Sequence, residues 1–466
     1  MKKMKKPPCQ PGQVIKLEIN DLNHMGEGVG KTDGFTLFVP GALPGEVVSA
    51  EVKRLRKNHG ETRLLAVEKA SPNRITPHCK YFFSCGGCQL QHLDYTGQLA
   101  WKKKRVAETL KRIAGLDNAE IITRPVLGME NPWHYRNKAR VHFSIEKGRV
   151  TGGFYRRQSH RLINIEDCPA LHPHASRTIN TLRTVLNNHT GKRQKAGIGK
   201  SNQEVFLPVE EATIRTSFAT GNCLVTLIPP GAAARKDPGQ LKKEYSKLAG
   251  ILGRTSEVPL SGITLLIPGK SNRNHLTLWG EPGLEEIIEP FRYHLSPDSF
   301  FQVNPQQAAV LYEQAASLCG RPRTAFDLYC GTGNFSLYLG QTAEEVIGVD
   351  SEAAAIKDAK ENAVLNEMLN LHFVHARVEE TPDLLDEGRQ PKAIVLNPPR
   401  QGCSQELLDA VSKAGAERII YISCNPATLA RDLNHLQAVG YSASIAQPLD
   451  MFPHTGHVET VALLQC

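Results

Sequence analysis

A cysteine, a glycine-rich loop and a cluster of further cysteines supply the residue types that could do chemistry in this chain. Cys424 stands in the run Ser423-Cys424-Asn425-Pro426, directly after an apolar, strand-like stretch. Asn is a good N-cap and Pro a good first helical residue, so a helix is predicted to begin there. A helix N-terminus favours the thiolate over the thiol, so Cys424 is a candidate nucleophile rather than one more buried structural thiol.

A ligand pocket is predicted where the run from Asp327 to Ser336 follows a strand and opens a helix. Its Gly331-Thr332-Gly333 permits a tight turn and a close approach of the backbone to a ligand. Asp350 ends the next strand, about twenty residues on, where an acid can hydrogen-bond the two hydroxyls of a ribose. The full dinucleotide fingerprint is absent, which argues against a dinucleotide, and the shorter Gly-Thr-Gly with a leading acid resembles the S-adenosylmethionine loop of class I methyltransferases.

A third strand is predicted to end in Asn397-Pro398-Pro399-Arg400. This run resembles the Asn/Asp-Pro-Pro-aromatic motif of enzymes that methylate exocyclic amines of bases. Arg400 stands where those enzymes have the aromatic residue that stacks on the base, which argues against amine chemistry.

Three cysteines share one short segment, in Cys79-x5-Cys85-Gly86-Gly87-Cys88, and Cys168 follows some eighty residues later. Four thiolates can hold zinc or an iron–sulfur cluster. Structural zinc usually takes two cysteine pairs, so the three-plus-one spacing with Pro169 favours a [4Fe–4S] cluster over zinc. A cytoplasmic chain with 11 cysteines is expected to keep them as thiols or metal ligands, not as disulfides.

The elements that position these groups change along the chain. Short strands with Gly and Pro turns over 12–69 predict a small barrel of the oligonucleotide-binding type. From Arg136 to Arg161, eight Lys or Arg and one acid alternate with apolar residues, which predicts an antiparallel sheet with a basic face. Trp133, Tyr135 and Tyr155 lie among these cations and suit unpaired bases. From Phe291 onward, strands and helices alternate as in a doubly wound α/β sheet.

Size and charge agree with this division. At roughly 150 residues per domain, 466 residues suggest about three domains. The first 170 residues hold 29 Lys and Arg against 16 Asp and Glu, whereas the remainder holds 27 against 31, which indicates an anionic macromolecular partner for the front of the chain. We expect a cytoplasmic protein with no membrane segment and no obligate protein partner, because neither a long apolar stretch nor a signal peptide is present.

A uracil substrate would explain why a methyltransferase needs a thiolate. Carbon 5 of uracil is too poor a nucleophile to attack a sulfonium methyl, but thiolate addition to carbon 6 makes an enolate that can. A base must then remove the proton from carbon 5 before the thiolate is expelled. The segment 450–460 supplies three candidate bases, namely His454, His457 and Glu459.

The chain resembles bacterial 23S rRNA (uracil-C5)-methyltransferases of the RlmD type. The matching parts are Phe300 to Asn304, Asp327 to Phe335, Ser423 to Asp432 and Asp450 to Glu459. The resemblance implies that Cys424 is the nucleophile and Glu459 the base, and that Cys79, Cys85, Cys88 and Cys168 hold a [4Fe–4S] cluster of structural role. It also implies that S-adenosyl-L-methionine is the methyl donor and contacts Gln302, Tyr329, Asp350 and Asn397. Asn397 departs from the Asp common in this branch.

The implied architecture has three parts: an OB-like RNA-binding barrel of the TRAM type over 7–69, a central α+β domain with the cluster over 75–290, and a Rossmann-like class I methyltransferase domain over 291–466. The helical segment 95–125 is expected to pack with the last. The implied product is 5-methyluridine in 23S rRNA. Three alternatives stay open: the same chemistry on another rRNA or tRNA uridine, a non-catalytic iron–sulfur RNA-binding factor, and a base-amine methyltransferase.

Overall fold

The computed structural model describes residues 7–195, 208–231, 237–267, 274–380 and 391–466. The chain divides into two compact units. The first comprises Met1–Lys102 together with Phe452–His457, and the second comprises Lys103–Met451 together with Val458–Cys466. Helix α1 (Tyr95–Thr109) crosses the division. Each unit is described separately below.

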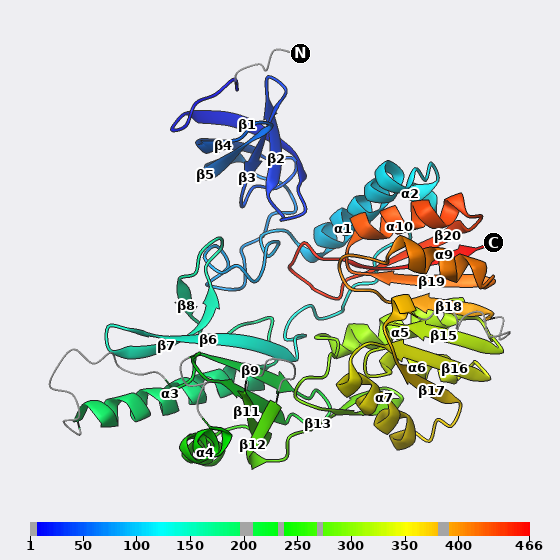
Figure 1. The fold of residues 1–466 in the computed structure, drawn as a ribbon. Coiled ribbons are helices and arrows are strands. Elements are labelled where there is room, and N and C mark those ends of the chain that lie inside the picture. The colour runs from blue at the N-terminus through cyan, green and yellow to red at the C-terminus, as the bar shows by residue number, and fades with distance from the viewer. Residues whose placement is uncertain (1–6, 196–207, 232–236, 268–273, 381–390) are drawn as a thin grey trace. The chain divides into compact units, whose positions relative to one another are not determined.

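The first unit contains a closed five-stranded barrel, which confirms the predicted fold of the front of the chain (Figure 1). Side chains that alternate along the strands fill its interior, as Val48, Ala50 and Val52 do in the fourth strand, where all three are fully buried. The strand order is β1-β2-β3-β5-β4. The strands are β1 (Val14–Leu22), β2 (Gly28–Thr32), β3 (Phe35–Val39), β4 (Val47–Leu55) and β5 (His59–Lys69).

A mixed seven-stranded sheet opens the second unit, in the order β12-β11-β10-β9-β6-β7-β8. All neighbours pair antiparallel except β10 and β11, which are parallel. Helices α3 (Pro173–Lys195) and α4 (Pro238–Thr255) pack their apolar sides on this sheet and form one core with it (Figure 1). The strands are β6 (Lys138–Glu146), β7 (Arg149–Tyr155), β8 (Leu162–Asn164), β9 (Glu211–Thr216), β10 (Cys223–Ile228), β11 (Leu260–Ile267) and β12 (Asn274–Gly280).

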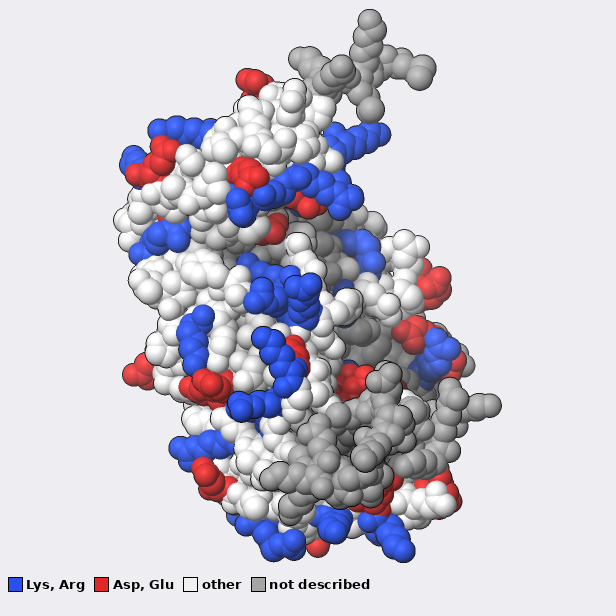
Figure 2. Space-filling view, turned by 90° about the vertical axis from the view of Figure 1, so that its left-hand side faces the viewer, with Lys and Arg blue, Asp and Glu red and all other residues white. Residues whose placement is uncertain are grey.

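The predicted basic face is present at the β6–β8 end of this sheet. Arg149, Arg156 and Arg161 are exposed, and Figure 2 looks onto this end and shows Lys and Arg side chains there with acidic ones between them. Of the aromatic residues expected among these cations, Tyr135 is buried and belongs to the core. Tyr155 is exposed and its ring lies 4.4 Å from that of His142, centroid to centroid.

The hairpin of β13 (Leu284–Ile288) and β14 (Phe291–Leu295) leads into a second seven-stranded sheet, in the order β17-β16-β15-β18-β19-β21-β20. Only β21 runs antiparallel to its neighbours. The order reverses between β15 and β18, and open α/β sheets bind ligands at such a point, beyond the carboxyl ends of the strands. The strands are β15 (Thr324–Leu328), β16 (Glu345–Asp350), β17 (Leu371–His375), β18 (Ala393–Leu396), β19 (Arg418–Ser423), β20 (Ser442–Leu449) and β21 (Glu459–Gln465).

Helices cover both faces of this sheet (Figure 1). One face packs on α9 (Gln405–Lys413), α10 (Pro426–Ala438) and apolar residues of 106–122, including Leu110 and Ile122. Asn434 and Gln437 of α10 also donate hydrogen bonds to the carbonyl of Ala114, both at 3.2 Å. The remaining helical elements are η1 (Leu110–Ala114), α2 (Ala119–Ile122), α5 (Pro305–Cys319), α6 (Asn334–Gly340), α7 (Ala353–Leu365) and η3 (Val378–Glu380).

Candidate active site

Cys424 lies in the two-residue step between β19 and α10. Asn425 is the N-cap of α10, and its side-chain oxygen accepts a hydrogen bond from the backbone N–H of Ala427 at 3.1 Å, while Pro426 is the first helical residue. The local structure is therefore the strand end and capped helix start that the residue types predict. The thiol is half-buried at the carboxyl edge of the sheet.

Glu459 comes to the same edge from the opposite direction. It is the first residue of β21, whose antiparallel register pairs Thr460 with Ser423, the last residue of β19. The next residue beyond this pair is Cys424 on one strand and Glu459 on the other. The carboxyl group is 5 % exposed, and burial raises its pKa from 4.5 to about 8, against an opposing effect of the Arg400 charge. The pair thus combines a thiol with a carboxyl group that can exchange a proton near neutral pH.

Burial and the Glu459 charge raise the pKa of the Cys424 thiol above its usual value, while Arg400 lowers it through its charge and a hydrogen bond. The net direction is opposite to the one that the helix N-terminus alone would produce. Burial is the largest cause of this rise, because desolvation disfavours the charged thiolate. The thiolate therefore depends on Arg400 and on what else enters the site.

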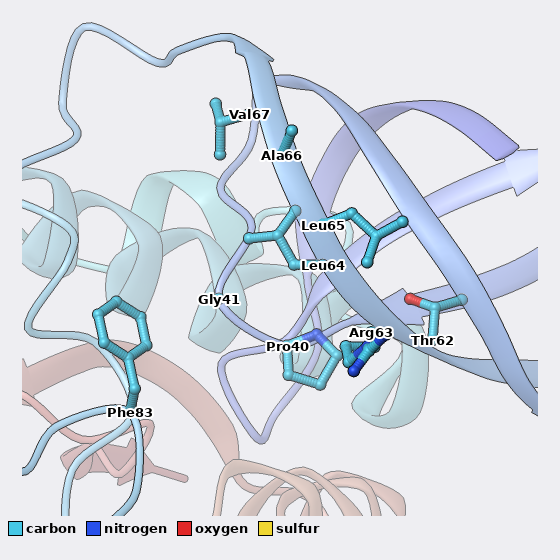
Figure 3. A pocket seen from close by; sticks show the side chains of 9 residues that line it. All are labelled: Pro40, Gly41, Thr62, Arg63, Leu64, Leu65, Ala66, Val67 and Phe83. Atoms are coloured by element: carbon cyan, nitrogen blue, oxygen red, sulfur yellow. The ribbon is translucent and has the colours of Figure 1, made fainter. Parts of the chain in front are cut away.

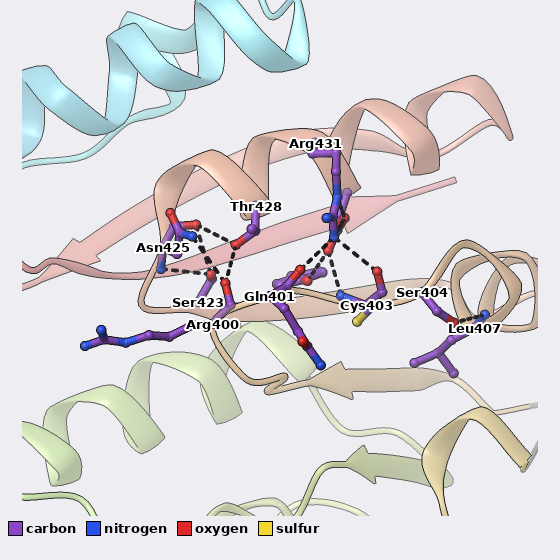
Figure 4. A network of polar contacts seen from close by, with 11 residues as sticks. Arg400, Gln401, Cys403, Ser404, Leu407, Ser423, Asn425, Thr428 and Arg431 are labelled. Carbon is purple, nitrogen blue, oxygen red and sulfur yellow. Dashed lines mark hydrogen bonds and ion pairs between the residues drawn. The ribbon is translucent and has the colours of Figure 1, made fainter. Parts of the chain in front are cut away.

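Arg400 is the residue of this site to which sequence reasoning assigned no role. It appeared there only as a departure from an amine-methylation motif. In the structure its guanidinium acts on both Cys424 and Glu459, and its side chain is exposed at the site. The backbone carbonyl of Arg400 accepts hydrogen bonds from Asn425 Nδ2 at 3.2 Å and Thr428 Oγ1 at 3.3 Å (Figure 4).

The loop after Arg400 is bound along its length to α10 (Figure 4). Arg431 Nη2 donates to the carbonyls of Gln401 at 3.0 Å and Cys403 at 3.1 Å. The buried carboxylate of Asp432 accepts from the backbone N–H of Cys403 at 2.9 Å and from the hydroxyl of Tyr421. Helix α10, which follows Cys424, therefore also fixes the position of the loop that begins at Arg400.

The predicted cofactor loop lies at the end of β15, which neighbours β18 and is two strands from β19. Tyr329 and Gly331 both have positive φ, 66° and 56°, so the chain turns sharply there. Nothing lies within 4 Å of the place a Cβ would take on Gly331, which leaves the backbone open to a ligand. Asp350 at the end of β16 accepts from the N–H of Gly331 at 2.9 Å and from that of Glu352 at 2.9 Å. The carboxylate is fixed beside the loop with lone pairs to spare for ribose hydroxyls.

Asn397, Gln302 and Asp327 complete the surroundings of this loop. Asn397 follows β18, and its N–H donates to the carbonyl of Leu328 at 3.2 Å. The structure thus brings Tyr329, Asp350 and Asn397 to the ends of three neighbouring strands. Gln302 is buried and its carbonyl accepts from Asn137 Nδ2 at 3.1 Å. Asp327 is buried, accepts from Ser336 Oγ at 2.6 Å, and has its pKa raised by burial to about 7.

The other two candidate bases belong to the first unit. His454 is buried, its Nδ1 lies 3.3 Å from Gln98 Nε2, and its backbone N–H donates to Gln98 Oε1 at 2.9 Å. Its carbonyl accepts from the N–H groups of Gln89 and Leu90, both at 2.9 Å. These contacts give His454 a structural role within that unit, which leaves Glu459 as the candidate base adjacent in register to Cys424.

The four cysteines of the predicted cluster are of intermediate exposure, with Cys79, Cys85 and Cys88 in the first unit and Cys168 in the second. In the described part of the chain, no group of three or more His, Cys, Asp or Glu residues is arranged to hold a metal ion. The geometry therefore gives the [4Fe–4S] prediction no support. Among the helices of the described ranges, none is long and apolar enough to cross a membrane.

Comparison with known proteins agrees with the fold at both ends of the chain. Residues 8–65 match the TRAM domain, and residues 283–466 match the tRNA (Uracil-5-)-methyltransferase family. An RNA methyltransferase of Listeria innocua is 38% identical over 461 residues, covering 97% of each chain, and one of Clostridium acetobutylicum is 36% identical over 464 residues, covering 98% of each.

A solved structure extends this likeness to three dimensions. The tRNA (uracil-54, C5)-methyltransferase of Pyrococcus abyssi, solved with S-adenosyl-L-homocysteine, is 25% identical, with a TM-score of 0.71, and the match covers 97% of this chain and 100% of that one. The similarity in sequence and the similarity in fold thus both extend over nearly the whole chain. The chain belongs to the S-adenosylmethionine-dependent RNA (uracil-5) methyltransferases that carry a TRAM domain.

Proposed function

We propose that the chain transfers a methyl group to carbon 5 of a specific uridine in 23S rRNA, with Cys424 as nucleophile and Glu459 as base. The observation that carries this proposal is the adjacency of a half-buried thiol and a buried carboxyl group across the β19–β21 pairing, with one guanidinium acting on both. The basic end of the central sheet supports a large anionic substrate.

The site residues divide the reaction between them. Cys424 adds to carbon 6 of the uracil, and the ring's electrons move to carbon 5 and the carbonyl at carbon 4 as an enolate. Bound S-adenosylmethionine supplies an electrophilic methyl group, which carbon 5 takes. Glu459, as carboxylate, accepts the proton from carbon 5, and the Cys424–carbon 6 bond breaks to restore the double bond. Arg400 stabilises the Cys424 thiolate before it adds to carbon 6 and the Glu459 carboxylate before it accepts the proton.

Gln302, Tyr329, Asp350 and Asn397 are the residues that would hold the donor. The open backbone at Gly331 and the fixed carboxylate of Asp350 fit a nucleoside with ribose hydroxyls. The target uridine must leave its base stack to reach Cys424, because a stacked base hides carbon 6.

The test uses 23S rRNA transcribed with and without 5-fluorouridine. With the ordinary transcript and labelled donor, label is expected in 5-methyluridine of the digested RNA. With the fluorinated transcript, Glu459 has no proton to remove from carbon 5, so a covalent protein–RNA complex should survive denaturing electrophoresis. Label in a methylated amine, or no complex with wild type, contradicts the proposal.

A tRNA is the second candidate substrate, because the Pyrococcus abyssi neighbour acts on uracil 54 of tRNA. The two are separated by offering an equimolar mixture of unmodified 23S rRNA and tRNA transcripts. Label confined to tRNA would transfer the proposal to that substrate and leave the chemistry unchanged.

We also propose that Cys79, Cys85, Cys88 and Cys168 hold a structural [4Fe–4S] cluster. Its support is the chemistry of the donor set, four partly accessible cysteines with three of them in one short segment, because cysteine thiolates are the ligands of [4Fe–4S] clusters. Iron and sulfide analysis of anaerobically purified protein tests it. Fewer than four irons per chain in the wild type, or the same content in Cys85→Ala, overturns it.

A further inference from the structure

A pocket of about 470 Å³ lies in the first unit, outside the catalytic residues, between strand β5 and the cysteine-rich segment (Figure 3). Its walls are largely apolar: Leu64 and Val67 lie on the same side of β5 as Phe83, with Pro40 below, while Leu65 points to the other side of the strand. A volume of this size is in the range that small planar ligands occupy. Leu64 and Val67 also pack against the barrel core, whereas Phe83 and Leu65 are exposed and have no role in the proposed methyl transfer.

The pocket exposes apolar surface that a closed barrel does not need to expose. Phe83 is 67% exposed and Leu65 47% exposed. The Phe83 ring has a fixed support, because the buried ring of Phe82 meets it edge-on at 5.0 Å and itself lies 5.3 Å from His92, centroid to centroid.

The floor of the pocket is fixed as well. Gly41 has a φ of 84°, and a Cβ there would lie 3.7 Å from Leu64 and 3.8 Å from the Phe83 ring, reaching into the gap between the walls. The carbonyl of Gly41 accepts a hydrogen bond from Arg74 Nη2 at 2.7 Å, and Arg74 is paired with the fully buried Glu46 at 2.5 Å. A buried ion pair thus holds the pocket open before any ligand arrives.

The charged residues of the barrel and of the pocket lining indicate which kind of ligand the pocket could bind. Residues 7–69 hold eight Lys or Arg and eight Asp or Glu, so the barrel has no net charge, and the excess of the front third lies outside it. The barrel as a whole therefore adds no net electrostatic attraction for the RNA backbone. Of the nine residues of the described chain that line the pocket, Arg63 alone is charged, and its side chain is 63% exposed at the rim.

We propose that this pocket takes one unpaired nucleobase of the substrate RNA, stacked on Phe83, with Arg63 beside the adjoining phosphate. Single-stranded nucleic acid is bound in this way, by aromatic faces and nearby cations. The inference rests on the proposed RNA substrate, but not on which RNA it is or on catalysis. The barrel then reads an exposed base, while the basic sheet of the second unit supplies the electrostatic attraction.

The test compares Phe83→Ala, Phe83→Trp and Arg63→Ala with Met25→Ala, an exposed apolar residue of the same barrel outside the pocket. Affinity for the RNA that the wild type methylates is measured by fluorescence anisotropy at several salt concentrations, without methyl donor. Phe83→Ala should weaken binding roughly 5- to 150-fold, the cost of one lost base stack, with an unchanged salt slope. Arg63→Ala should lower the slope by about one phosphate contact.

Phe83→Trp is expected to keep the affinity and to report stacking as a quench of its fluorescence when RNA is added. It also guards against a folding artefact, since it retains the ring. Wild-type affinity in Phe83→Ala, or no quench in Phe83→Trp, overturns the pocket proposal. RNA binding that is weakened by Phe83→Ala, but with no methyl transfer by the wild type, would instead contradict the proposed function and leave the pocket proposal standing. The two failures are therefore distinct.

Discussion

Cys424 and Glu459 are the residues directly beyond the last register pair of β19 and β21, one leaving its strand and the other entering it. Because β21 alone runs antiparallel in its sheet, the start of that strand meets the carboxyl ends of the others. The proposed nucleophile and the proposed base, 35 positions apart in sequence, are thereby set side by side by the backbone pairing of two strands.

Replacing the nucleophile should abolish turnover without loss of the fold. Cys424→Ser keeps the size of the side chain, but its hydroxyl is far less acidic than a thiol and does not add to carbon 6. Neither label transfer nor a covalent complex with fluorinated RNA is expected. Cys403→Ser, at a buried thiol on the neighbouring loop, is the matched control. Covalent complex in Cys424→Ser would refute the assignment.

Glu459→Gln should separate the two halves of the reaction. The amide cannot take the proton from carbon 5, so the methylated adduct should accumulate while turnover falls by about 10²- to 10⁴-fold, the usual contribution of a general base. Single-turnover mixing with quenching shows the adduct as protein that carries both RNA and the methyl label. Free 5-methyluridine formed at the wild-type rate would remove Glu459 from the mechanism.

The same variant should change stability with pH. The folded chain raises the pKa of Glu459 from 4.5 to about 8, so the folded state binds this proton more tightly than the unfolded state. The free energy of unfolding therefore falls as the pH rises through that window. Glu459→Gln, which is always neutral, should match the wild type near pH 4.5 and melt at a higher temperature at pH 8.5. Equal melting temperatures at pH 8.5 would contradict the burial argument.

Arg400 should set the pH at which the site works. It lowers the pKa of both Cys424 and Glu459, so Arg400→Gln should move the rising limb of the kcat profile to higher pH, because both groups act as anions. Arg400→Lys keeps the charge and should move the profile less. A loss of rate in Arg400→Gln with an unmoved pH profile would assign the residue to RNA contact instead.

Asn425 offers a test of the link between α10 and the Arg400 loop. Asn425→Asp keeps the capping oxygen but loses the amide that donates to the Arg400 carbonyl, whereas Asn425→Ala loses both. The Ala variant should lose about 1 kcal/mol of stability as a missing cap does, and the Asp variant should not. Both should slow methyl transfer. Full activity in both variants would show that the loop does not need this bond.

Asp350→Ala should raise the KM for the methyl donor roughly 10- to 150-fold, the effect of losing hydrogen bonds to a charged group, with little change in RNA affinity. Isothermal calorimetry with the donor analogue and anisotropy with RNA measure the two separately. Asp358→Asn, at an acid of α7 that binds Ser296 Oγ at 2.9 Å, is a control for general disturbance of the domain. Unchanged donor affinity in Asp350→Ala would contradict the ribose assignment.

Local patterns were enough to predict much of this molecule. The alternation in β4 predicts a barrel strand, and the strand ends at Asp350, Asn397 and Cys424 predict a shared edge, because periodicity and caps are local properties. The role of Arg400 was not predictable in this way: its effect on Cys424 and Glu459 depends on how α10 holds a separate loop. The raised pKa of the thiol was missed for the same reason, since burial is a property of the fold.

The cysteine cluster shows a limit of prediction from sequence spacing. Spacing groups three thiols and points to a metal, but the predicted fourth ligand, Cys168, belongs to another unit, and sequence spacing contains no information on whether it joins the other three. Charge counting over the first third similarly merged a neutral barrel with a basic sheet. Composition averages over elements that the fold separates.

The segment Phe452–His457 belongs to the first unit although its flanks belong to the second. On the ribosome, this segment is made many seconds after the barrel, at about 5–20 residues per second. Until then Gln89, Leu90 and Gln98 lack the partners that His454 provides. A nascent chain that has not yet reached 452–457 therefore leaves the unit that contains the barrel unfinished, although most of that unit's residues have already been made.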